Sequence, residues 1–236
     1  HRDLHSSPTR RSSDLAAALG VALPAELVEI YTDVDGVMTA DPRLVAKAKP
    51  MATLTYTEIC EMAHLGAKVV HPRAVEIAME GRVPLRIRST FSSSPGTLVT
   101  DGRSIAGVEI RGDKVVTGLA HVSGVALVKI NALEDLNETG QVVGIFEALA
   151  REGISVDMIH VTPAAVNFLV QEERADRAAE ILTAFGLQVE TQAAVAKVSV
   201  VGAGMRGVPG VMARVARGLN KAGIPILQRS EERRVG

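Results

Sequence analysis

The sequence predicts an α/β protein in which a region of alternating strands and helices is followed by two copies of a smaller βαββαβ module. Two observations support this prediction. A strand-forming run at residues 28–31 leads directly into an aspartate-rich loop, as is typical of strand ends in parallel α/β sheets. Beyond residue 115 the sequence repeats itself at a fixed offset, which indicates duplicated modules.

The strand at residues 28–31 ends in a loop whose side chains suit chemistry. A threonine and three aspartates follow within one short stretch: Thr32, Asp33, Asp35 and Asp41. Gly36 lets this stretch turn tightly. Carboxylates and hydroxyls suit a ribose hydroxyl, an adenine amine or a hydrated magnesium ion, and Arg43 suits phosphate oxygens. An ordinary Asp-Gly and Asp-Pro turn is the alternative.

Helix signals surround this loop. Residues 16–19 are expected to end a helix that stops at Gly20. A helix is expected over residues 56–65, opened by Thr53 or by Thr55, and Thr55 and Glu58 have the spacing of a capping box. Its buried stripe is expected to contain Ile59, Met62 and Leu65.

A second helix is expected to start at Pro72, since proline is favoured in the first turn. Val75 and Met79 should face inward from this helix, and residues 83–88 should form a strand. His71 is expected to be a structural turn residue, because the sequence places no carboxylate beside it to orient it as a base.

The repeat defines the second half of the chain. Gly140 and Gly153 recur as Gly210 and Gly223, an offset of 70 residues, and each pair brackets an amphipathic helix followed by an apolar strand. The first copy has the order βαββαβ, which is ferredoxin-like. Its helices are expected to bury Val142, Ile145, Phe146 and Leu149, and Ala178, Ile181 and Leu182. The second copy would need about forty further residues, so we expect a fragment.

Composition and charge restrict the function further. The 236 residues are 47% hydrophobic and 22% charged, as in ordinary soluble proteins. A net charge of −1 gives no electrostatic footprint for nucleic acid or an acidic membrane, so small molecules and copies of the chain are the expected partners. Cys60 is the only cysteine, which excludes an internal disulfide and a cysteine zinc cluster and fits a cytoplasmic location. We assign no residue to a metal site, and no stretch is apolar enough to span a bilayer.

The two ends of the chain differ from the rest. Residues 1–15 are polar and aperiodic, and residues 229–236 form a charged run without a helix cap. Both resemble translated sequencing-adaptor sequence, and natural disordered tails are the alternative. We set both segments aside from the fold.

The acidic stretch TDVDGVMTADPR, residues 32–43, resembles the nucleotide loop of the amino-acid kinase family, which includes aspartokinases, glutamate 5-kinases and uridylate kinases. The segments LGAK and HPRA around Lys68 and His71 resemble an aspartokinase segment whose lysine reaches the ATP phosphates. A solvated charge at a helix end is the alternative for Lys68. The resemblance implies the C-terminal part of the family's three-layer α/β domain.

The stretch KVSVVGAGMRGVPGV, residues 197–211, resembles the signature of the ACT domain, a module that binds amino acids and works in pairs. A flexible glycine connector is the alternative. The resemblance implies association between copies of the chain and an effector site. Its residues would be Met205, Gly207, Val208, Pro209 and Gly210.

A kinase segment followed by two ACT-like modules is similar to the aspartokinases. The resemblance implies ATP-dependent phosphorylation of L-aspartate at its side-chain carboxylate, with ATP and Mg²⁺ bound and with lysine, threonine or diaminopimelate as effector. The nucleotide would be held by Thr32, Asp33, Met38, Thr39, Ala40, Asp41, Pro42, Arg43 and Lys68. The catalytic residues are expected in the missing N-terminal part, so this chain alone should not turn over. The alternatives are a non-catalytic ACT regulatory subunit and a uridylate-type kinase.

These inferences predict a division of the chain into six segments. The terminal segments are the tails already described, residues 1–15 and 229–236. Between them we expect the C-terminal part of a kinase domain at residues 16–100, a linker at 101–115, a first ACT module at 116–192 and a truncated second module at 193–228.

Overall fold

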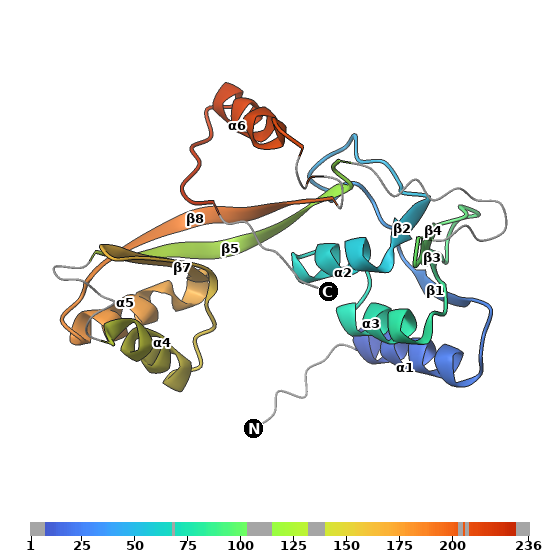
Figure 1. Cartoon of the computed structure of the whole chain (residues 1–236), viewed down its shortest axis with the longest axis horizontal. Coiled ribbons are helices and arrows are strands. Elements are labelled where there is room, and N and C mark those ends of the chain that lie inside the picture. Colours follow the sequence, from blue (N-terminus) through green and yellow to red (C-terminus); the bar gives the residue numbers. More distant parts are fainter. Residues whose placement is uncertain are drawn as a thin grey trace. The chain divides into compact units, whose positions relative to one another are not determined.

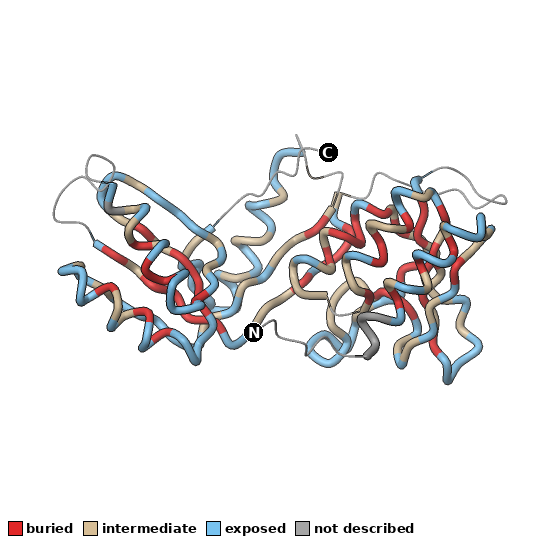
Figure 2. The backbone as a smooth tube through the Cα atoms, turned by 90° about the horizontal axis from the view of Figure 1, so that it is seen from below, coloured by how far each residue is buried: buried red, intermediate tan, exposed pale blue. Residues whose placement is uncertain are grey.

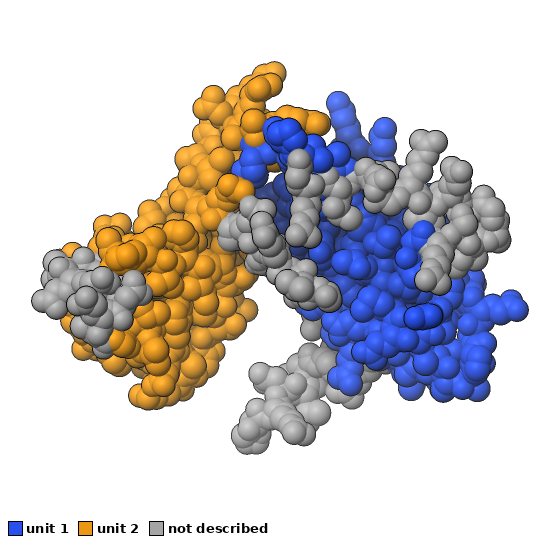
Figure 3. Space-filling view, in the orientation of Figure 1, with its two compact units in different colours: residues 1–121, 198–212 blue, residues 122–197, 213–236 orange. Residues whose placement is uncertain are grey.

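The computed structural model describes residues 8–67, 69–102, 115–131, 140–202, 205 and 208–229. The chain forms two compact units (Figure 3). Residues 1–121 and 198–212 make the first unit, and residues 122–197 and 213–236 make the second. Each unit has its own hydrophobic core.

The first unit is built on a mixed sheet with the strand order β1-β3-β4-β2. Its strands are β1 (Val28–Thr32), β2 (Thr53–Thr55), β3 (Leu85–Ser89) and β4 (Thr97–Thr100). Strands β1 and β3 are parallel, whereas β4 is antiparallel to β3 and parallel to β2. Because β1 and β3 end at the same edge, the loops that follow them lie close together.

Three helices named in Figure 1 pack on this sheet: α1 (Pro8–Ala22), α2 (Tyr56–His64) and α3 (Pro72–Gly81). Helix α3 contacts both α1 and α2. The core beneath them contains buried residues of all four strands, including Val28, Leu54, Ile87 and Val99. The other face of β1 and β3 is polar. There a terminal nitrogen of Arg88 lies 3.5 Å from Oε1 of Glu29.

Helix α2 begins as its capping box predicts. The Thr55 hydroxyl accepts a hydrogen bond from the backbone N–H of Glu58 at 3.2 Å, and the Glu58 carboxylate accepts one from the backbone N–H of Thr55 at 2.9 Å. Ile59 and Met62 are buried, and Leu65 packs against the same core. The predicted stripe is therefore confirmed.

Helix α1 differs from its prediction at both ends. It begins at Pro8, so residues 8–15, which we had set aside, form its first half. It also continues through Gly20 to Ala22, so the predicted stop is wrong. A Cβ at Gly20 would lie 2.2 Å from Cγ2 of Val28. The glycine thus lets α1 approach β1 closely, and it does not cap the helix.

Helix α3 starts at Pro72 as predicted, but Met79 does not face inward. Met79 is 41% exposed, whereas Ala74, Val75 and Ala78 are fully buried. The contact with α1 and α2 uses the small residues of the helix, so the buried stripe is displaced from Met79.

Most of the predicted ferredoxin-like module lies in the second unit, whereas its residues 118–121 and 198–201 belong to the first. Its elements are β5 (Gly118–Asn131), α4 (Gln141–Arg151), β6 (Asp157–Thr162), β7 (Ala165–Gln171), the 3-10 turn η1 (Glu172–Arg174), α5 (Ala175–Ala184) and β8 (Gln188–Val201). The strand order β6-β7-β5-β8 is the one that a βαββαβ chain forms.

The predicted core of this module is confirmed. Ile145, Leu149, Ala178 and Leu182 are buried, and Val142, Phe146 and Ile181 pack against them as partly buried residues. Figure 2 shows the buried stretches of the backbone in red. The ring of Phe146 meets that of Phe168 edge-on at a centroid distance of 5.8 Å.

The second copy consists of the end of β8 and helix α6 (Val211–Lys221). We expected an apolar strand after Gly223, but residues 224–229 form none, so this expectation is wrong. A strand needs a neighbour to accept its ladder hydrogen bonds, and the described part of the chain offers none there. Helix α6 accordingly has no buried residue.

None of the helices in the described residues combines the length and the apolar character that a membrane span requires.

Candidate functional site

The candidate site lies at the edge of the first sheet where β1 and β3 end. The Thr32 hydroxyl donates to Oδ1 of the exposed Asp33 at 2.9 Å. The backbone N–H of Thr90 donates to the carbonyl of Thr32 at 2.9 Å, and the Ser92 hydroxyl donates to Oδ1 of Asp35 at 2.5 Å. The loops after β1 and β3 are therefore joined.

Residues 37–51 leave this edge as a hairpin that is closed at its base by Thr97. The Thr97 hydroxyl accepts from the backbone N–H of Val37 at 2.8 Å and donates to the carbonyl of Met51 at 2.6 Å. Gly36 precedes the hairpin with a φ of +126°, which a side chain would strain. A Cβ on this residue would also lie 2.6 Å from the Thr97 hydroxyl.

The arms of the hairpin are paired next to its base, where residues 37–39 face residues 49–51. Met38 forms a β-bridge with Pro50. Thr39 is held to Lys49 twice, because its backbone N–H donates to the Lys49 carbonyl at 2.9 Å and its hydroxyl accepts from the Lys49 backbone N–H at 3.0 Å. The predicted nucleotide residues Met38 to Arg43 thus lie on a defined support.

The tip of the hairpin carries a bidentate ion pair. Nε and a terminal nitrogen of Arg43 donate to the two carboxylate oxygens of Asp41 at 3.0 and 2.8 Å, and the backbone N–H of Arg43 donates at 2.9 Å. The Arg43 side chain is 82% exposed, whereas that of Asp41 is 16% exposed. Asp41 therefore fixes a solvent-facing guanidinium.

The charges at the tip are coupled. Hydrogen bonds from the Arg43 side chain and then from its backbone lower the pKa of Asp41 to about 2, with a smaller contribution from the charge of His121. The pKa of Arg43 is raised, mainly by Asp41 and to a lesser extent by Asp33. Asp33, Asp41 and Arg43 therefore belong to one electrostatic group, suited to a ligand that has both hydroxyl and phosphate groups.

The structure brings most of the predicted nucleotide residues to one place. Thr32 and Asp33 stand at the end of β1, and Met38, Thr39, Ala40, Asp41, Pro42 and Arg43 form the outer hairpin. Lys68 lies outside the described residues, so its place relative to this edge stays a prediction.

His71 requires a correction, because it does have a carboxylate beside it. Its Nδ1 lies 3.0 Å from Oδ1 of Asp14 on helix α1, and both side chains are partly exposed. The sequence offered no signal for this pair, since the two residues are far apart along the chain and Asp14 belongs to the segment that we had set aside.

The predicted effector residues precede helix α6. The backbone N–H of Met205 donates to the Gly202 carbonyl and that of Val208 donates to the Met205 carbonyl, both at 3.3 Å. Val208, Pro209 and Gly210 are exposed, whereas Gly207 lies outside the described residues.

Comparison with known proteins matches both halves of the chain. The model of the amino acid kinase family matches residues 6–89, and an ACT domain model matches residues 120–184 and 190–234. Aspartokinase 1 of Bacillus subtilis is 45% identical over 220 residues, which cover 93% of this chain and 54% of the relative. The chain is homologous to the aspartokinases. It spans about half the length of the curated aspartokinases that it matches.

Solved aspartokinase structures have the same fold. The aspartate kinase of Clostridium acetobutylicum superposes with a TM-score of 0.81 at 23% identity, covering 94% of this chain and 52% of that one. Aspartokinase III of E. coli in complex with aspartate and ADP gives a TM-score of 0.70 at 29% identity, covering 89% and 47%. The complex of the same enzyme with lysine and aspartate gives a TM-score of 0.67 at 30% identity, and the match covers 81% of this chain and 43% of that one. The α/β kinase segment followed by ACT segments is thus an aspartokinase arrangement.

Proposed function

We propose that the chain is the nucleotide-holding and regulatory part of an aspartate kinase, which transfers a phosphoryl group from ATP to the side-chain carboxylate of L-aspartate. The observation that carries the proposal is the place of residues 32–43. These residues match the nucleotide loop of the family, and they lie where two parallel strands end. The homology to aspartokinases, one of which was solved with ADP and aspartate, supports the same conclusion.

Phosphoryl transfer needs positioning and charge neutralisation more than covalent chemistry from the protein. In the proposed site Thr32 and Asp33 bind the nucleoside through its hydroxyl or amine groups. Arg43 faces the phosphates and is kept in place by Asp41. Lys68 is assigned to the phosphates on its motif alone.

Magnesium would reach the site with the nucleotide. The described residues include no group of three or more His, Cys, Asp or Glu side chains that could hold a metal ion. Mg²⁺ commonly binds through phosphate oxygens, water and one or two carboxylates, and the carboxylates at this edge fit that pattern.

The ACT segments are proposed to bind an amino-acid end product that regulates the kinase. Met205, Gly207, Val208, Pro209 and Gly210 are the proposed contacts, and lysine, threonine or diaminopimelate is the proposed effector, in keeping with synthesis of these amino acids from aspartate. The lysine-bound E. coli relative supports this class of ligand. We further propose that copies of the chain associate through these segments and that the protein is cytoplasmic.

Calorimetric titration of the 236-residue chain with Mg-ATP tests the nucleotide site. We expect saturable binding of ATP that Asp33→Asn weakens at least about tenfold, because a charged hydrogen bond to the ligand is lost. Asp176→Asn, which changes an exposed aspartate on α5, is the matched control and should leave binding unchanged.

The same titration separates the alternative functions. Binding of lysine, threonine or diaminopimelate without binding of ATP would favour a regulatory subunit. A preference for UMP over ATP would favour a uridylate-type kinase. Either result would refute the aspartate kinase assignment.

A further inference from the structure

The start of strand β5 lies directly against the hairpin of the proposed nucleotide site. The backbone N–H of Leu119 donates to the carbonyl of Thr39 at 2.8 Å. Thr39 is held by Lys49 on the opposite arm of the hairpin, so it is bonded to two segments distant in sequence. A movement of residue 119 would therefore pull on the hairpin at Thr39, beside its base.

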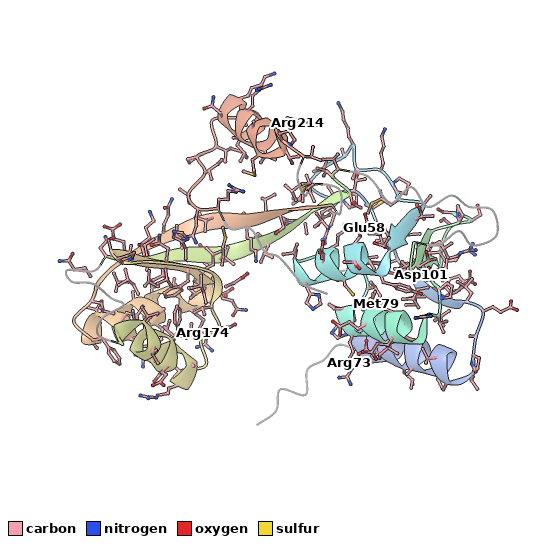
Figure 4. All side chains as sticks on the ribbon, viewed as in Figure 1. Glu58, Arg73, Met79, Asp101, Arg174 and Arg214 are labelled. Atoms are coloured by element: carbon pink, nitrogen blue, oxygen red, sulfur yellow. The ribbon has the colours of Figure 1, made fainter. Side chains whose placement is uncertain are left out.

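Thr117, two residues earlier, is fixed by a buried carboxylate. Its hydroxyl donates to Oε1 of Glu58 at 2.5 Å, and each of these residues is only 6% exposed. The other oxygen of Glu58 accepts from the backbone N–H and the hydroxyl of Thr55, both at 2.9 Å. Glu58, which lies at the start of α2 (Figure 4), thus joins the helix cap to the beginning of β5. Buried hydrogen bonds to a charged group are among the stronger ones in proteins.

Gly118, between these two residues, brings the backbones into close contact. A Cβ there would lie 2.9 Å from Cε of Met62 and 3.3 Å from the carbonyl oxygen of Thr39. Any side chain would have to displace either the core or the hairpin. The contact between β5 and the hairpin is therefore closely packed.

The same segment is bonded to the end of β8. The backbone N–H of Thr117 donates to the carbonyl of Val201 at 2.7 Å, and Val201 is buried in the core of the first unit. A Cβ at Gly202 would lie 2.4 Å from the carbonyl oxygen of Val115. Strand β8 leads into the segment that holds the proposed effector residues, so these contacts join the chain just before that segment to residues 115–117.

We propose that residues 117–119 position the nucleotide hairpin and that the end of β8 acts on the hairpin through them. For its link to ATP this proposal rests on the proposed function. Thr117 is a positioning residue, since it touches Glu58 and Val201 and acts on Thr39 only through Leu119. A displacement at Val201 would move Thr117 and then the carbonyl of Thr39.

Linkage makes the proposal quantitative. If an intact contact at residues 117–119 favours ATP binding, bound ATP must favour that contact by the same factor. Bound ATP should therefore slow hydrogen exchange at the Leu119 amide, and loosening the contact should weaken ATP binding. A purely structural role for Thr117 would not make bound ATP slow hydrogen exchange at the Leu119 amide.

Thr117→Val tests the contact, because it removes the hydroxyl and keeps the size of the side chain. In the full 236-residue chain we expect the amides of Thr39, Lys49 and Leu119 to exchange about 5- to 30-fold faster, as for the loss of one or two kcal/mol of local stability. ATP affinity should fall by about fivefold or more. Thr117→Ser keeps the hydroxyl and should restore both values. The amide of Ile87 in the same unit should not change, which excludes general unfolding.

Gly202→Ala tests the link to β8 at a residue outside the nucleotide hairpin. Its Cβ would press on Val115, so we expect the same faster exchange at Thr39 and Leu119. Gly144→Ala is the matched control, because Gly144 lies within helix α4 and nothing comes within 4 Å of a Cβ there.

The outcomes separate this proposal from the proposed function. Unchanged exchange at Thr39 and Leu119 in Thr117→Val, with ATP still bound by the parent chain, would refute the positioning role and leave the nucleotide site intact. Faster exchange in a chain that does not bind ATP would support the mechanical contact and refute the proposed function. Faster exchange in Thr117→Val together with unchanged exchange in Gly202→Ala would show that β8 does not act on the hairpin.

Discussion

Asp41 and Arg43 are the residues whose chemistry at the proposed site is best defined. Their bidentate pair places a fixed positive charge at the tip of the hairpin, and Asp33 lies close enough to reinforce it. A free arginine would lose side-chain entropy when it bound a phosphate. Here Asp41 has already restricted the side chain, so the cost of ordering it on binding is smaller.

The acidity of Asp41 can be tested directly. Its pKa of about 2 lies below the ordinary value of 3.8, so the pair contributes stability above pH 3.8 that is lost as the pH falls through about 2. Arg43→Ala should return the pKa toward 3.8, as followed by carbon NMR titration of the carboxylate. Arg73→Ala, at an exposed arginine on α3, should have no effect (Figure 4). A pKa that stayed near 2 in Arg43→Ala would show that Arg43 is not its cause.

At the scale of elements, the hairpin of residues 37–51 depends on a threonine outside it. Thr97 is fully buried and satisfies one backbone group on each arm, at Val37 and Met51. Local sequence inside the hairpin cannot supply this closure, because both backbone groups are buried at its base.

Thr97→Val should therefore destabilise the first unit. It leaves the N–H of Val37 and the carbonyl of Met51 buried without their partner, at a cost of about 1–3 kcal/mol for each group. Urea unfolding should show a lower midpoint for this variant, and Thr97→Ser should stay close to the parent chain. Equal midpoints for the valine and serine variants would show that the hydroxyl does not close the hairpin.

Elements with complete local signals were predictable, whereas those set by distant contacts were not. The capping box of Thr55 and Glu58 predicted the start of α2, and the apolar patterns of the first copy predicted its βαββαβ order. The predicted helix stop at Gly20 is wrong because this glycine lets α1 approach Val28. The predicted burial of Met79 is wrong because α3 packs through its alanines. Nothing near these residues in the sequence reveals those neighbours.

The proposed site divides in the same way. Residues 32–43 form one contiguous stretch, so the sequence alone could place them together at a strand end. Thr97 is bonded to Val37 of this stretch from 60 residues away, and Thr117 and Leu119 lie still farther along the chain. Ordinary threonines and a backbone amide carry no sequence signature, so their part in the site required the structure.

At the scale of the whole molecule, the proposed function couples a nucleotide loop to amino-acid-sensing modules. The kinase match at residues 6–89 and the ACT matches from residue 120 support the presence of both parts. The bonds of Thr117 and Leu119 provide a physical connection between them within the first unit. This function requires first that ATP binds at the edge formed by β1 and β3.

Backbone amide chemical-shift mapping of the 236-residue chain with Mg-ATP tests this requirement most directly. The account predicts that the largest shifts fall in residues 32–43 and in residues 90–92, whose backbone and side chains are bonded to the loop after β1. Shifts confined to the module of residues 122–197, or no shifts within residues 32–43 at saturating ATP, would contradict it.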